Sequence, residues 1–359
     1  MRDDHIFQAA ALERAIGAVI AAAGSHHAEA SHVARSLVES NLRGHDSHGI
    51  GMTPRYVDAT LDGGLLPNAQ ARVTLDTGSL LALDGARGYG QVIGDQAMEQ
   101  ATVRCRTHGS CVMALANTHH LGRIGQFGEV AASRGLVSLH FVNVLSAPRV
   151  APWGGADARY GTNPCCVAIP IPGELPLILD FATSAVAQGK LRVAYNKGEQ
   201  VAPGLLIDDR GAPTTDPRYA VVPPHGAMMP FGEHKGYGLA VVCELLGGAL
   251  TGSGTEDGAH RAHSGVINGM LTIVIDPARL GTSEALARYT ERFLGWLRGS
   301  PVAEGFDRVR IAGEPEREMR ARRSVDGIPV DVTTWNAIGQ AAEKVGLARD
   351  RVDALARAK

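Results

Sequence analysis

The feature of the sequence that most limits the possible folds is a strand–loop–helix–strand pattern in the first half of the chain. An apolar run is followed by a polar loop, a helical pattern and a second apolar run, over residues Val112–Ala116, Asn117–Leu121, Gly122–Ser133 and Leu136–Val144. Alternation of this kind is typical of α/β domains, which hold ligands at strand ends. The pattern therefore predicts an α/β fold with a ligand site in the loop.

Helical patterns dominate both ends of the chain. Near the start, apolar residues recur at helical spacing in Ile6–Ala23 and in His27 to about Leu42. Near the end, the same spacing predicts helices over Ser283–Leu297, Thr333–Val345 and Asp350–Ala358. We therefore expect a helical layer, built from both termini, packed on a middle α/β region.

Further elements are predicted between these ends. Strands are expected within Ala71–Leu83, Cys165–Ile171, Leu175–Leu179 and Met270–Ile275. Helices are expected over Gly90 to about Thr107, Ser184 to about Tyr195 and Leu239–Leu250. Loops are expected over Gly204–Pro217 and Gly252–Ser264. We expect residues 1–120 to form an N-terminal helical and substrate domain, completed by residues 286–359. Residues 121–285 then form the α/β domain.

The standard dinucleotide fingerprint is missing from the sequence. Gly88-x-Gly90 is followed by Gly94 instead of a glycine at 93, and Gly236-x-Gly238 is followed by Val241, so neither completes GxGxxG. If a nucleotide binds, it binds to a scaffold other than the doubly wound one.

The hexapeptide Gly44–Gly49 (GHDSHG) gathers chemically active side chains. His45 and His48 lie within three residues of each other, together with Asp46 and Ser47, which can fix the tautomer and charge of an imidazole. This pattern indicates a proton-transfer site. A purely structural interpretation is open as well, in which Asp46 and Ser47 cap a turn and the histidines are solvated.

Two other loops suit an anion. Asn117–Arg123 (NTHHLGR) offers imidazoles, a guanidinium and the free amides of a helix start, although it also fits an interface loop with a buried histidine. Phe231–Gly238 (FGEHKGYG) leads into an apolar helix, and Lys235 could meet an anion there. In this second loop the glycines are equally compatible with close helix packing.

Composition narrows the classes of partner. The formal net charge is −2 and we find no run of Lys and Arg, so binding to nucleic acid or to an anionic membrane surface is not expected. The five cysteines contain no CxxC pair, which favours a reducing cytoplasm. The N-terminal residues lack the apolar core of a signal peptide, and no apolar stretch is long enough to span a membrane. A small-molecule partner is favoured.

A catalytic metal and a serine hydrolase are both disfavoured. The pairs His45/His48, His119/His120 and Glu233/His234 could converge on a metal, but no HExxH pattern is present and we predict no metal site. The nucleophile motif Gly-x-Ser-x-Gly is also missing.

Nine segments of the chain resemble one family. LRGHDSHGIGMTPRY, NTHHLGRIGQF, RYGTNPCCVAIP, LDFATSAVAQGK, APTTDP, EHKGYGLAVVCELLGGALTG, IDPARL and GEPER with DGIP occur in the order found in the malate/L-lactate dehydrogenase superfamily. This non-Rossmann family also includes ureidoglycolate and sulfolactate dehydrogenases and Δ1-piperideine-2-carboxylate reductase. The resemblance covers the chain from about residue 5 to its end.

The resemblance implies a homodimer with a mixed, largely antiparallel sheet that binds NAD or NADP. It implies that His48 is the proton donor and acceptor beside the nicotinamide and that Ser47 polarises it, while some relatives give this role to the histidine matching His120. The implied cofactor contacts are His48, Gly122, Arg123, Ile124, Ile178, Leu179, Asp180, Phe181, Ala182, His234, Asn268, Gly313, Glu314, Pro315 and Glu316. Lys235 neighbours this set.

The expected substrate is a 2-oxo acid or 2-hydroxycarboxylic acid of the malate, lactate or aryl-lactate type. An imidazole with a pKa near ~6.5 suits proton transfer in both directions, and Arg55 or Arg123 can grip the substrate carboxylate, with Thr162 nearby. Ureidoglycolate-type relatives place an arginine at the position of Met52, so its loss favours a less polar substrate. Asp180 could bond ribose hydroxyls and mildly favour NAD, or could cap the next helix. The alternatives are a cyclic imino acid reductase, a metal-dependent hydrolase and a non-catalytic nucleotide or metabolite sensor.

Overall fold

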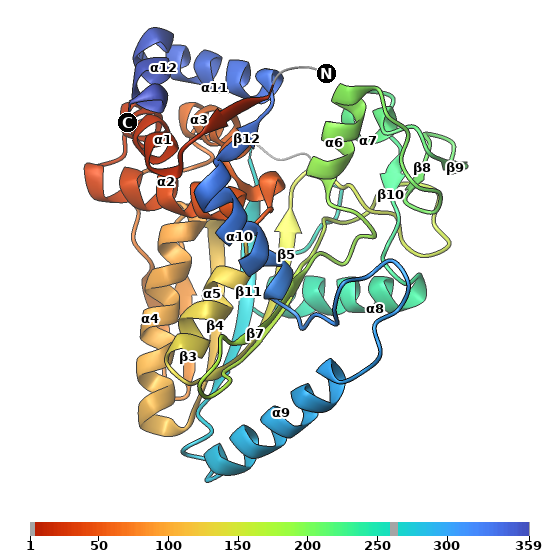
Figure 1. Cartoon of the computed structure of the whole chain (residues 1–359). Coiled ribbons are helices and arrows are strands. Elements are labelled where there is room, and N and C mark those ends of the chain that lie inside the picture. Colours follow the sequence, from red (N-terminus) through yellow and green to blue (C-terminus); the bar gives the residue numbers. More distant parts are fainter. Residues whose placement is uncertain (1–3, 259–264, 359) are drawn as a thin grey trace.

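A seven-stranded mixed sheet forms the centre of the molecule. The computed structural model describes residues 4–258 and 265–358. The strands lie in the order β2-β3-β4-β11-β5-β6-β7, with bounds Arg72–Asp76, Leu80–Asp84, Ser110–His119, Ile267–Ile275, Val137–Leu145, Cys165–Ile169 and Leu177–Phe181. β3 and β4 run parallel, and the other neighbouring strands run antiparallel (Figure 1). The expected mixed, largely antiparallel sheet is confirmed.

Two helices cover one face of this sheet. α4 (Gly90–His108) connects the parallel strands β3 and β4, and α5 (Gly125–Ser133) connects β4 to β5. They bury one apolar core against the sheet, which includes Ile93 and Phe127. A Cβ at Gly94 would lie 2.3 Å from Cζ of Phe127, so the two helices can approach this closely only because residue 94 has no side chain.

A helical layer from both termini packs at one end of the sheet. α1 (Ala9–Ala22), α2 (His27–Leu42), α3 (Thr53–Leu61), α11 (Val332–Lys344) and α12 (Arg349–Arg357) share a second core. The short strands β1 (His5–Phe7) and β12 (Ile328–Val330) pair antiparallel and join the two chain ends. The expected helical layer is therefore confirmed, and its close packing follows from the amphipathic spacing.

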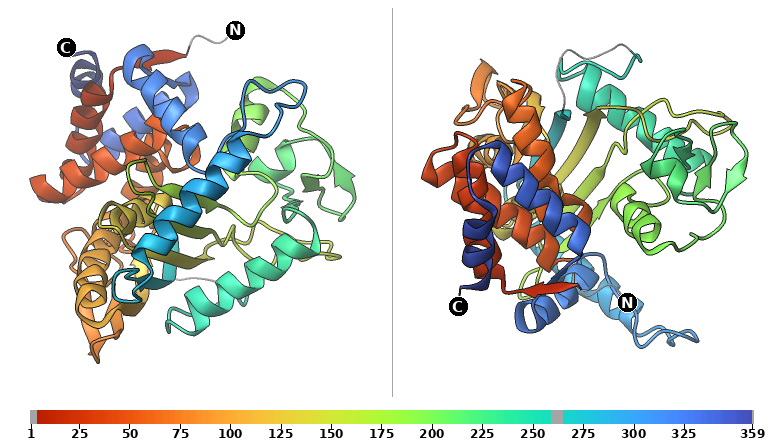
Figure 2. Two further views of the ribbon diagram at one scale, coloured as in Figure 1. Left: turned by 60° about the horizontal axis from the view of Figure 1, so that its bottom comes forward. Right: turned by 90° about the horizontal axis from the view of Figure 1, so that it is seen from above.

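A smaller unit forms from a part of the sequence in which only turns and one helix are predicted. Its strands β8 (Leu206–Ile207), β9 (Pro213–Thr214) and β10 (Ala227–Met228) pack with α6 (Gln188–Lys197) and α7 (Arg218–Val221). Figure 2 shows this unit and the helical layer on either side of one end of the sheet. They meet where Gly189 packs on Ser47, since a Cβ there would lie 2.5 Å from the serine Cβ.

Three helices complete the chain. α8 (His234–Cys243) continues into a π-helical segment (Glu244–Ala249), and α10 (Glu314–Asp326) returns to the helical layer. α9 (Ser283–Arg298) lies apart from that layer and buries only Leu294, against Ile171 and Ile311. Among the described residues, we find no helix with the length and apolar character needed to cross a lipid bilayer.

Some elements differ from the sequence prediction. α3 and α10 are not anticipated, and β4 extends through Asn117 to His119, where a loop is expected. The sheet also takes strands β2 to β4 from before residue 120, because α4 connects β3 to β4 as a parallel pair. The division into domains near residues 120 and 285 stays a prediction. Of the loop expected over 252–264, residues 259–264 lie outside the described residues.

We predict that Gly94→Ala lowers the free energy of unfolding by about 1–3 kcal/mol, the usual cost of overpacking a core. Its new methyl group would collide with the ring of Phe127, which is fully buried. The matched control is Gly295→Ala in α9, where nothing lies within 4 Å of the new Cβ. This control should gain about 0.5–1 kcal/mol from helix propensity. Urea unfolding followed by circular dichroism measures both, and equal effects would contradict the packing argument.

Candidate active site

Two imidazoles stack at the junction between the helical layer and the sheet. His48 ends a short 3-10 helix (Asp46–His48), and His120 follows the last residue of β4. Their ring centroids lie 5.5 Å apart and their planes differ by 13°. The two histidines that the resemblance offers as alternatives for acid/base chemistry are therefore neighbours in a single site.

Each imidazole has a hydroxyl partner at Nδ1. Oγ of Ser47 lies 2.9 Å from Nδ1 of His48, and the hydroxyl of Tyr56 lies 2.8 Å from Nδ1 of His120. Nε2 of Gln91 donates to the Tyr56 hydroxyl at 2.7 Å, and that hydroxyl can still donate its own proton to Nδ1 of His120. When it does so, Nε2 of His120 carries the ring proton. Tyr56 and Gln91 have no assigned role in the sequence analysis; Tyr56 lies within its quoted motif, but only α3 brings it to His120.

Both imidazoles are held in the neutral form. Burial, with smaller contributions from the nearby charges of His45 and Arg123, lowers the pKa of His48 to about 4. Burial also lowers the pKa of His120 well below its ordinary value, with smaller contributions from His48, His119 and Arg55. A neutral imidazole can accept a proton at one nitrogen and donate from the other, which suits proton transfer.

A polar clamp fixes the segment that carries His48. Asn41, which is buried in α2, accepts a hydrogen bond from the Ile50 amide at 2.8 Å and donates to Oδ1 of Asp46 at 2.6 Å. Arg323 of α10 donates to both carboxylate oxygens of Asp46, at 2.7 and 3.0 Å. Asp46 therefore anchors the segment, and Ser47 is the residue that contacts the imidazole.

A pocket of about 180 Å³ lies between β7 and the start of α10. Its lining comes from two distant parts of the sequence, Ile178, Leu179, Asp180 and Arg310, Ile311, Ala312, Gly313, Pro315, Glu316. The Ile178 amide donates to the Ala312 carbonyl at 3.2 Å and joins the two walls. Glu316 also lies 3.7 Å from Nε2 of His45, which connects the pocket to the His48 segment. Six of the residues implied as cofactor contacts line this one pocket.

Other residues of the implied cofactor set form the pocket's support. Arg123 is buried and forms a two-bond ion pair with Glu129, at 3.2 and 2.8 Å. Oδ2 of Asp180 accepts the Gly125 amide at 2.7 Å, so this carboxylate holds the first turn of α5 and not that of the next helix. Burial raises the pKa of Asp180. The Arg123 guanidinium and the Asp180 carboxylate are therefore already bonded to other groups of the protein.

Asn268 positions the loop that carries His120. Its Oδ1 accepts the Leu121 amide and its Nδ2 donates to the Asn143 carbonyl, both at 2.8 Å. The loop then turns at Gly122, whose φ of +79° favours glycine, and Ile124 is buried at the start of α5. These bonds orient the backbone beside His120.

The remaining implied residues lie around these contacts. Phe181 is the last residue of β7 and Ala182 follows it, and the Phe181 ring packs edge-on against Phe231 at 5.4 Å. Glu314 accepts the Ile311 amide at 3.0 Å and so shapes the turn before α10. The backbone carbonyl of Thr162 accepts from Thr183 at 2.9 Å.

His234 is exposed at the start of α8, with its ring 5.6 Å from that of Trp153. It does not belong to the lining of the pocket at β7 and α10, nor does the neighbouring Lys235. Within the described part of the chain, no group of three or more His, Cys, Asp or Glu residues lies close enough to hold a metal ion.

Arg55, whose charge acts on His120, and two arginines whose charges act on Arg55 have no acidic partner among the residues that the structure describes. They are Arg55 in α3, Arg149 after β5, and Arg192 in α6. Arg192 lies against Gly51, because a Cβ there would be 3.2 Å from its Nη2. Burial lowers the pKa of Arg55, and the charges of Arg149 and Arg192 lower it further. The site thus contains positive charge that is not neutralised by the protein.

A family model described as malate/L-lactate dehydrogenase matches residues 7–339. The chain belongs to this family. It is 43% identical to hydroxycarboxylate dehydrogenase B of Escherichia coli (strain K12) over 356 residues, which cover 99% of this chain and 98% of that protein. It is 42% identical to an L-lactate dehydrogenase of Cupriavidus necator over 323 residues, covering 89% and 92% of the two chains.

The fold of this member of the malate/L-lactate dehydrogenase family is also similar to that of a solved structure. The structure of a putative malate/lactate dehydrogenase from E. coli superposes with a TM-score of 0.92 at 43% identity, and covers 98% of both chains. The family resemblance stated from the sequence motifs is therefore confirmed. The site residues carried over by that resemblance stay predictions.

We predict that the His48 imidazole of the ligand-free protein stays neutral as the pH falls from 8 to 5 and gains its proton only near pH 4. The reason is that burial and neighbouring positive charge disfavour the imidazolium and lower its pKa to about 4. Histidine NMR signals followed against pH measure this, and the His48→Asn variant identifies the signal. Titration of that signal at an ordinary value near ~6.5 would contradict the electrostatic argument.

Proposed function

We propose that the protein is an NAD(P)-dependent oxidoreductase that interconverts 2-oxo acids and 2-hydroxycarboxylic acids. The observation that carries the proposal is the stacked pair His48 and His120, which is connected to the pocket at β7 and α10 through His45 and Glu316 and is influenced by the charge of Arg55. The reaction needs a hydride acceptor, a proton acceptor and a carboxylate-binding cation. These three regions of the site can supply them.

The pocket at β7 and α10 fits part of a dinucleotide. Ile178 and Leu179 offer an apolar wall, and the Glu316 carboxylate at the start of α10 can accept hydrogen bonds from hydroxyl groups of the ligand. Gly313, with φ of +93°, keeps this wall open, since a Cβ there would lie 3.3 Å from the backbone nitrogen of Ile178. When bound, the nicotinamide group accepts or donates the hydride.

We assign the acid/base role to His48 and hydrogen-bond donation to His120. The Ser47 hydroxyl can donate to Nδ1 of His48 or accept from it, so it can accompany both protonation states. By contrast, accepting a hydrogen bond from Gln91 strengthens the Tyr56 hydroxyl as a donor to His120, and we therefore place the ring proton of His120 on Nε2. In oxidation, His48 takes the hydroxyl proton of the substrate; in reduction it returns this proton to the 2-oxo oxygen, which His120 polarises.

Arg55 is our candidate for the substrate carboxylate. It precedes Tyr56, its positive charge acts on His120, and it forms no ion pair with the described residues. Arg123, the other expected candidate, is neutralised by Glu129 and supports the wall of the pocket. The choice between NAD and NADP is open to direct assay, since Asp180, the residue expected to bias it, bonds the Gly125 amide.

We predict that His48→Ala lowers kcat for the reduction of an oxo acid by at least about 10², as expected when a general acid is lost. Absorbance at 340 nm, with NADH and NADPH in parallel, measures turnover. Added imidazole should partly restore the His48→Ala enzyme, because a free acid can enter the space, but should not restore His120→Ala. His27→Ala, on an exposed position of α2, is the control.

The outcomes separate the two histidines. If added imidazole restored His120→Ala but not His48→Ala, His120 would be the residue that delivers the proton. No oxidation of NADH or NADPH with any of oxaloacetate, pyruvate or phenylpyruvate, by folded and chelator-treated protein, would make the proposed reaction untenable.

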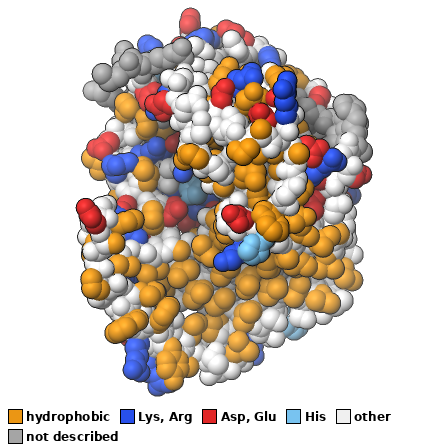
Figure 3. Space-filling view, turned by 90° about the vertical axis from the view of Figure 1, so that its right-hand side faces the viewer, with side chains coloured by type: hydrophobic (Ala, Val, Ile, Leu, Met, Phe, Trp, Pro, Cys, Tyr) orange, Lys and Arg blue, Asp and Glu red, His pale blue; other side chains and the backbone are white. Residues whose placement is uncertain are grey.

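We also propose a cytoplasmic homodimer. The five cysteines are buried free thiols, which suits a reducing compartment. Figure 3 faces the side of the molecule on the right of Figure 1, near α8, and shows a broad field of apolar side chains. Val242 and Leu245 near the end of α8, with 41% and 52% of their surface exposed, and Leu250 with 64%, are the kind of residues that a subunit interface covers.

We predict a mass in solution of two chains of 37.7 kDa each. Leu245→Glu should shift the protein toward the single-chain mass, because it places a charge in an apolar contact. Light scattering after size exclusion measures the mass. Glu304→Gln, an exposed change far from α8 in the sequence, is the control. A single-chain mass for the unaltered protein at assay concentration would contradict the dimer.

A further inference from the structure

The turn between β3 and α4 has a strained backbone. Ala86 and Arg87 have φ values of +49° and +55°, and the Gly88 amide donates to the Gly85 carbonyl at 2.9 Å across them. Both central residues of this β-turn are therefore left-handed, a conformation in which glycine, asparagine and aspartate are the usual residues. Strain of this kind at alanine and arginine persists only where the surrounding contacts impose it.

A third left-handed residue lies against the turn. Asn117, near the end of β4, has a φ of +52°. Its carbonyl accepts the Arg87 amide at 2.8 Å, and its side chain donates to Oδ1 of Asp84 at 3.0 Å. The same carboxylate oxygen accepts the Ala86 amide at 2.8 Å. Asp84 and Asn117 therefore hold the strained turn against the strand that leads to His120.

Arg87 is also bonded to the segment that follows α3. Its carbonyl accepts the Leu66 amide at 3.0 Å, and its Nη1 donates to the Gly63 carbonyl at 2.9 Å. α3 carries Tyr56, whose hydroxyl lies 2.8 Å from Nδ1 of His120. Arg87 therefore connects the strand before His120 to the segment after the helix that carries Tyr56. It joins the two partners of the Tyr56–His120 hydrogen bond by a second route.

The residues after the turn contact the backbone of His120 itself. The Gly88 carbonyl accepts the His119 amide at 3.0 Å. At Gly90 a Cβ would lie 2.3 Å from the His120 carbonyl oxygen, so the first turn of α4 lies directly against the His120 backbone. The position of the turn therefore affects the His120 backbone as well as the hydrogen-bond partner of its ring.

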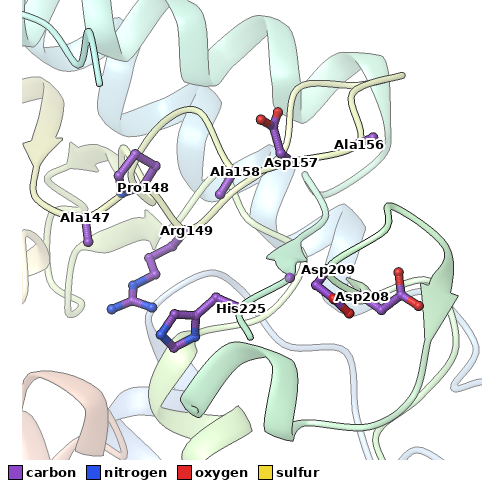
Figure 4. A pocket seen from close by; sticks show the side chains of 10 residues that line it. Ala147, Pro148, Arg149, Ala156, Asp157, Ala158, Asp208, Asp209 and His225 are labelled. Carbon is purple, nitrogen blue, oxygen red and sulfur yellow. The ribbon is translucent and has the colours of Figure 1, made fainter. Parts of the chain in front are cut away.

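The turn acts on the site from outside it. Among the described residues, 85–88 belong neither to the lining of the pocket at β7 and α10 nor to that of the cavity of about 210 Å³ beside Arg149 and His225 (Figure 4). Any effect of the turn on a reaction must therefore pass through the residues that it holds in place.

We propose that Arg87 is a positioning residue for the reaction. The turn at Ala86 and Arg87 holds the end of β4 against the segment after α3, and so keeps the Tyr56 hydroxyl within hydrogen-bond distance of Nδ1 of His120. With the donor direction assigned above, this bond fixes the ring proton on Nε2, from which His120 polarises the 2-oxo oxygen. The inference rests on the proposed function and adds a residue that sets the tautomer of His120.

The first test follows the ring nitrogens of His120 by nitrogen NMR in the full chain without cofactor, with His120→Asn to identify the signals. The unaltered protein should show a protonated Nε2 and an unprotonated Nδ1. In Arg87→Gly and Arg87→Ala both nitrogens should move toward intermediate shifts, because the two tautomers then exchange. Arg87→Lys should return the signals part of the way, since lysine can donate to the Gly63 carbonyl.

Two of these variants separate positioning from stability. Arg87→Gly relieves the left-handed strain and Arg87→Ala does not, although both remove the guanidinium, so Arg87→Gly should unfold at a higher urea concentration. Both should lower kcat for an oxo acid by about 10- to 100-fold, as expected for a misplaced reacting group, and change KM by less than about threefold. Arg14→Ala is the matched control, because Arg14 of α1 likewise donates to a distant backbone carbonyl, that of Ala358. It should leave kcat and the His120 signals unchanged.

A double variant tests the route through Tyr56. Tyr56→Phe removes the hydroxyl through which Arg87 acts on His120. Adding Arg87→Ala to Tyr56→Phe should therefore lower kcat by less than about threefold further, since the bond that Arg87 maintains is already lost.

The outcomes distinguish this proposal from the reaction itself. Three results would each overturn the positioning role: His120 signals in Arg87→Gly that match those of the unaltered protein, a kcat that recovers together with stability from Arg87→Ala to Arg87→Gly, or a full further loss in the Tyr56→Phe background. Without turnover of any oxo acid by the unaltered protein, the proposed function would fall, and the NMR comparison would still decide whether Arg87 sets the tautomer of His120.

Discussion

The ion pair between Arg323 and Asp46 holds together the parts of the molecule on which the site depends. Asp46 accepts hydrogen bonds from Arg323 of α10 and Asn41 of α2, and Asn41 also accepts one from the Ile50 amide. The segment between Asp46 and Ile50 carries His48. Gly49 must be glycine for this packing, because a Cβ there would lie 2.2 Å from Oδ1 of Asn41. One polar junction therefore fixes His48 relative to helices from both halves of the sequence.

The same helix α10 connects this junction to the pocket at β7. Its first turn supplies Pro315 and Glu316 to the pocket, and Arg323 lies two turns further along. A helix is stiff over this length, so a shift of its first turn moves Arg323 as well. The position of His48 is thereby coupled to the wall of the pocket where we place the cofactor. Such coupling would hold the His48 imidazole and a cofactor in this pocket at fixed relative positions, which a reaction between bound groups requires.

Much of the fold could be predicted from the sequence because its signals are local. Amphipathic spacing indicates α1, α2 and α11, and apolar runs indicate β5 and β6. α10 escapes this reasoning because its sequence, EPEREMRARRSVD, is charged on every side and buries no residue completely. It is held by ion pairs to distant residues, such as Arg320 with Glu39, and long-range pairs leave no periodic trace.

In the candidate site too, some residues are predicted by local sequence patterns and others depend on contacts between distant segments. The motif GHDSHG marks His48 directly, and the family resemblance marks His120 and the residues around Asp180. The Gln91–Tyr56–His120 chain joins α4, α3 and the end of β4, and no spacing along the sequence connects them. Arg149 lies in a segment without a recognisable pattern, and Arg192 lies in a predicted helix but outside the motifs that mark the site. Their significance depends on what they lack, an acidic partner, and that can be seen only in three dimensions.

The two imidazoles and the arginines without acidic partners are held by separate parts of the structure. His48 and His120 are fixed by the clamp, by Tyr56 and by the Asn268 bond to the loop at Leu121, all on the helical layer and the sheet. Arg149 and Arg192 come from a loop and from the smaller unit, and neither bonds those residues. These arginines can therefore be replaced without disturbing the bonds that hold the two imidazoles in place.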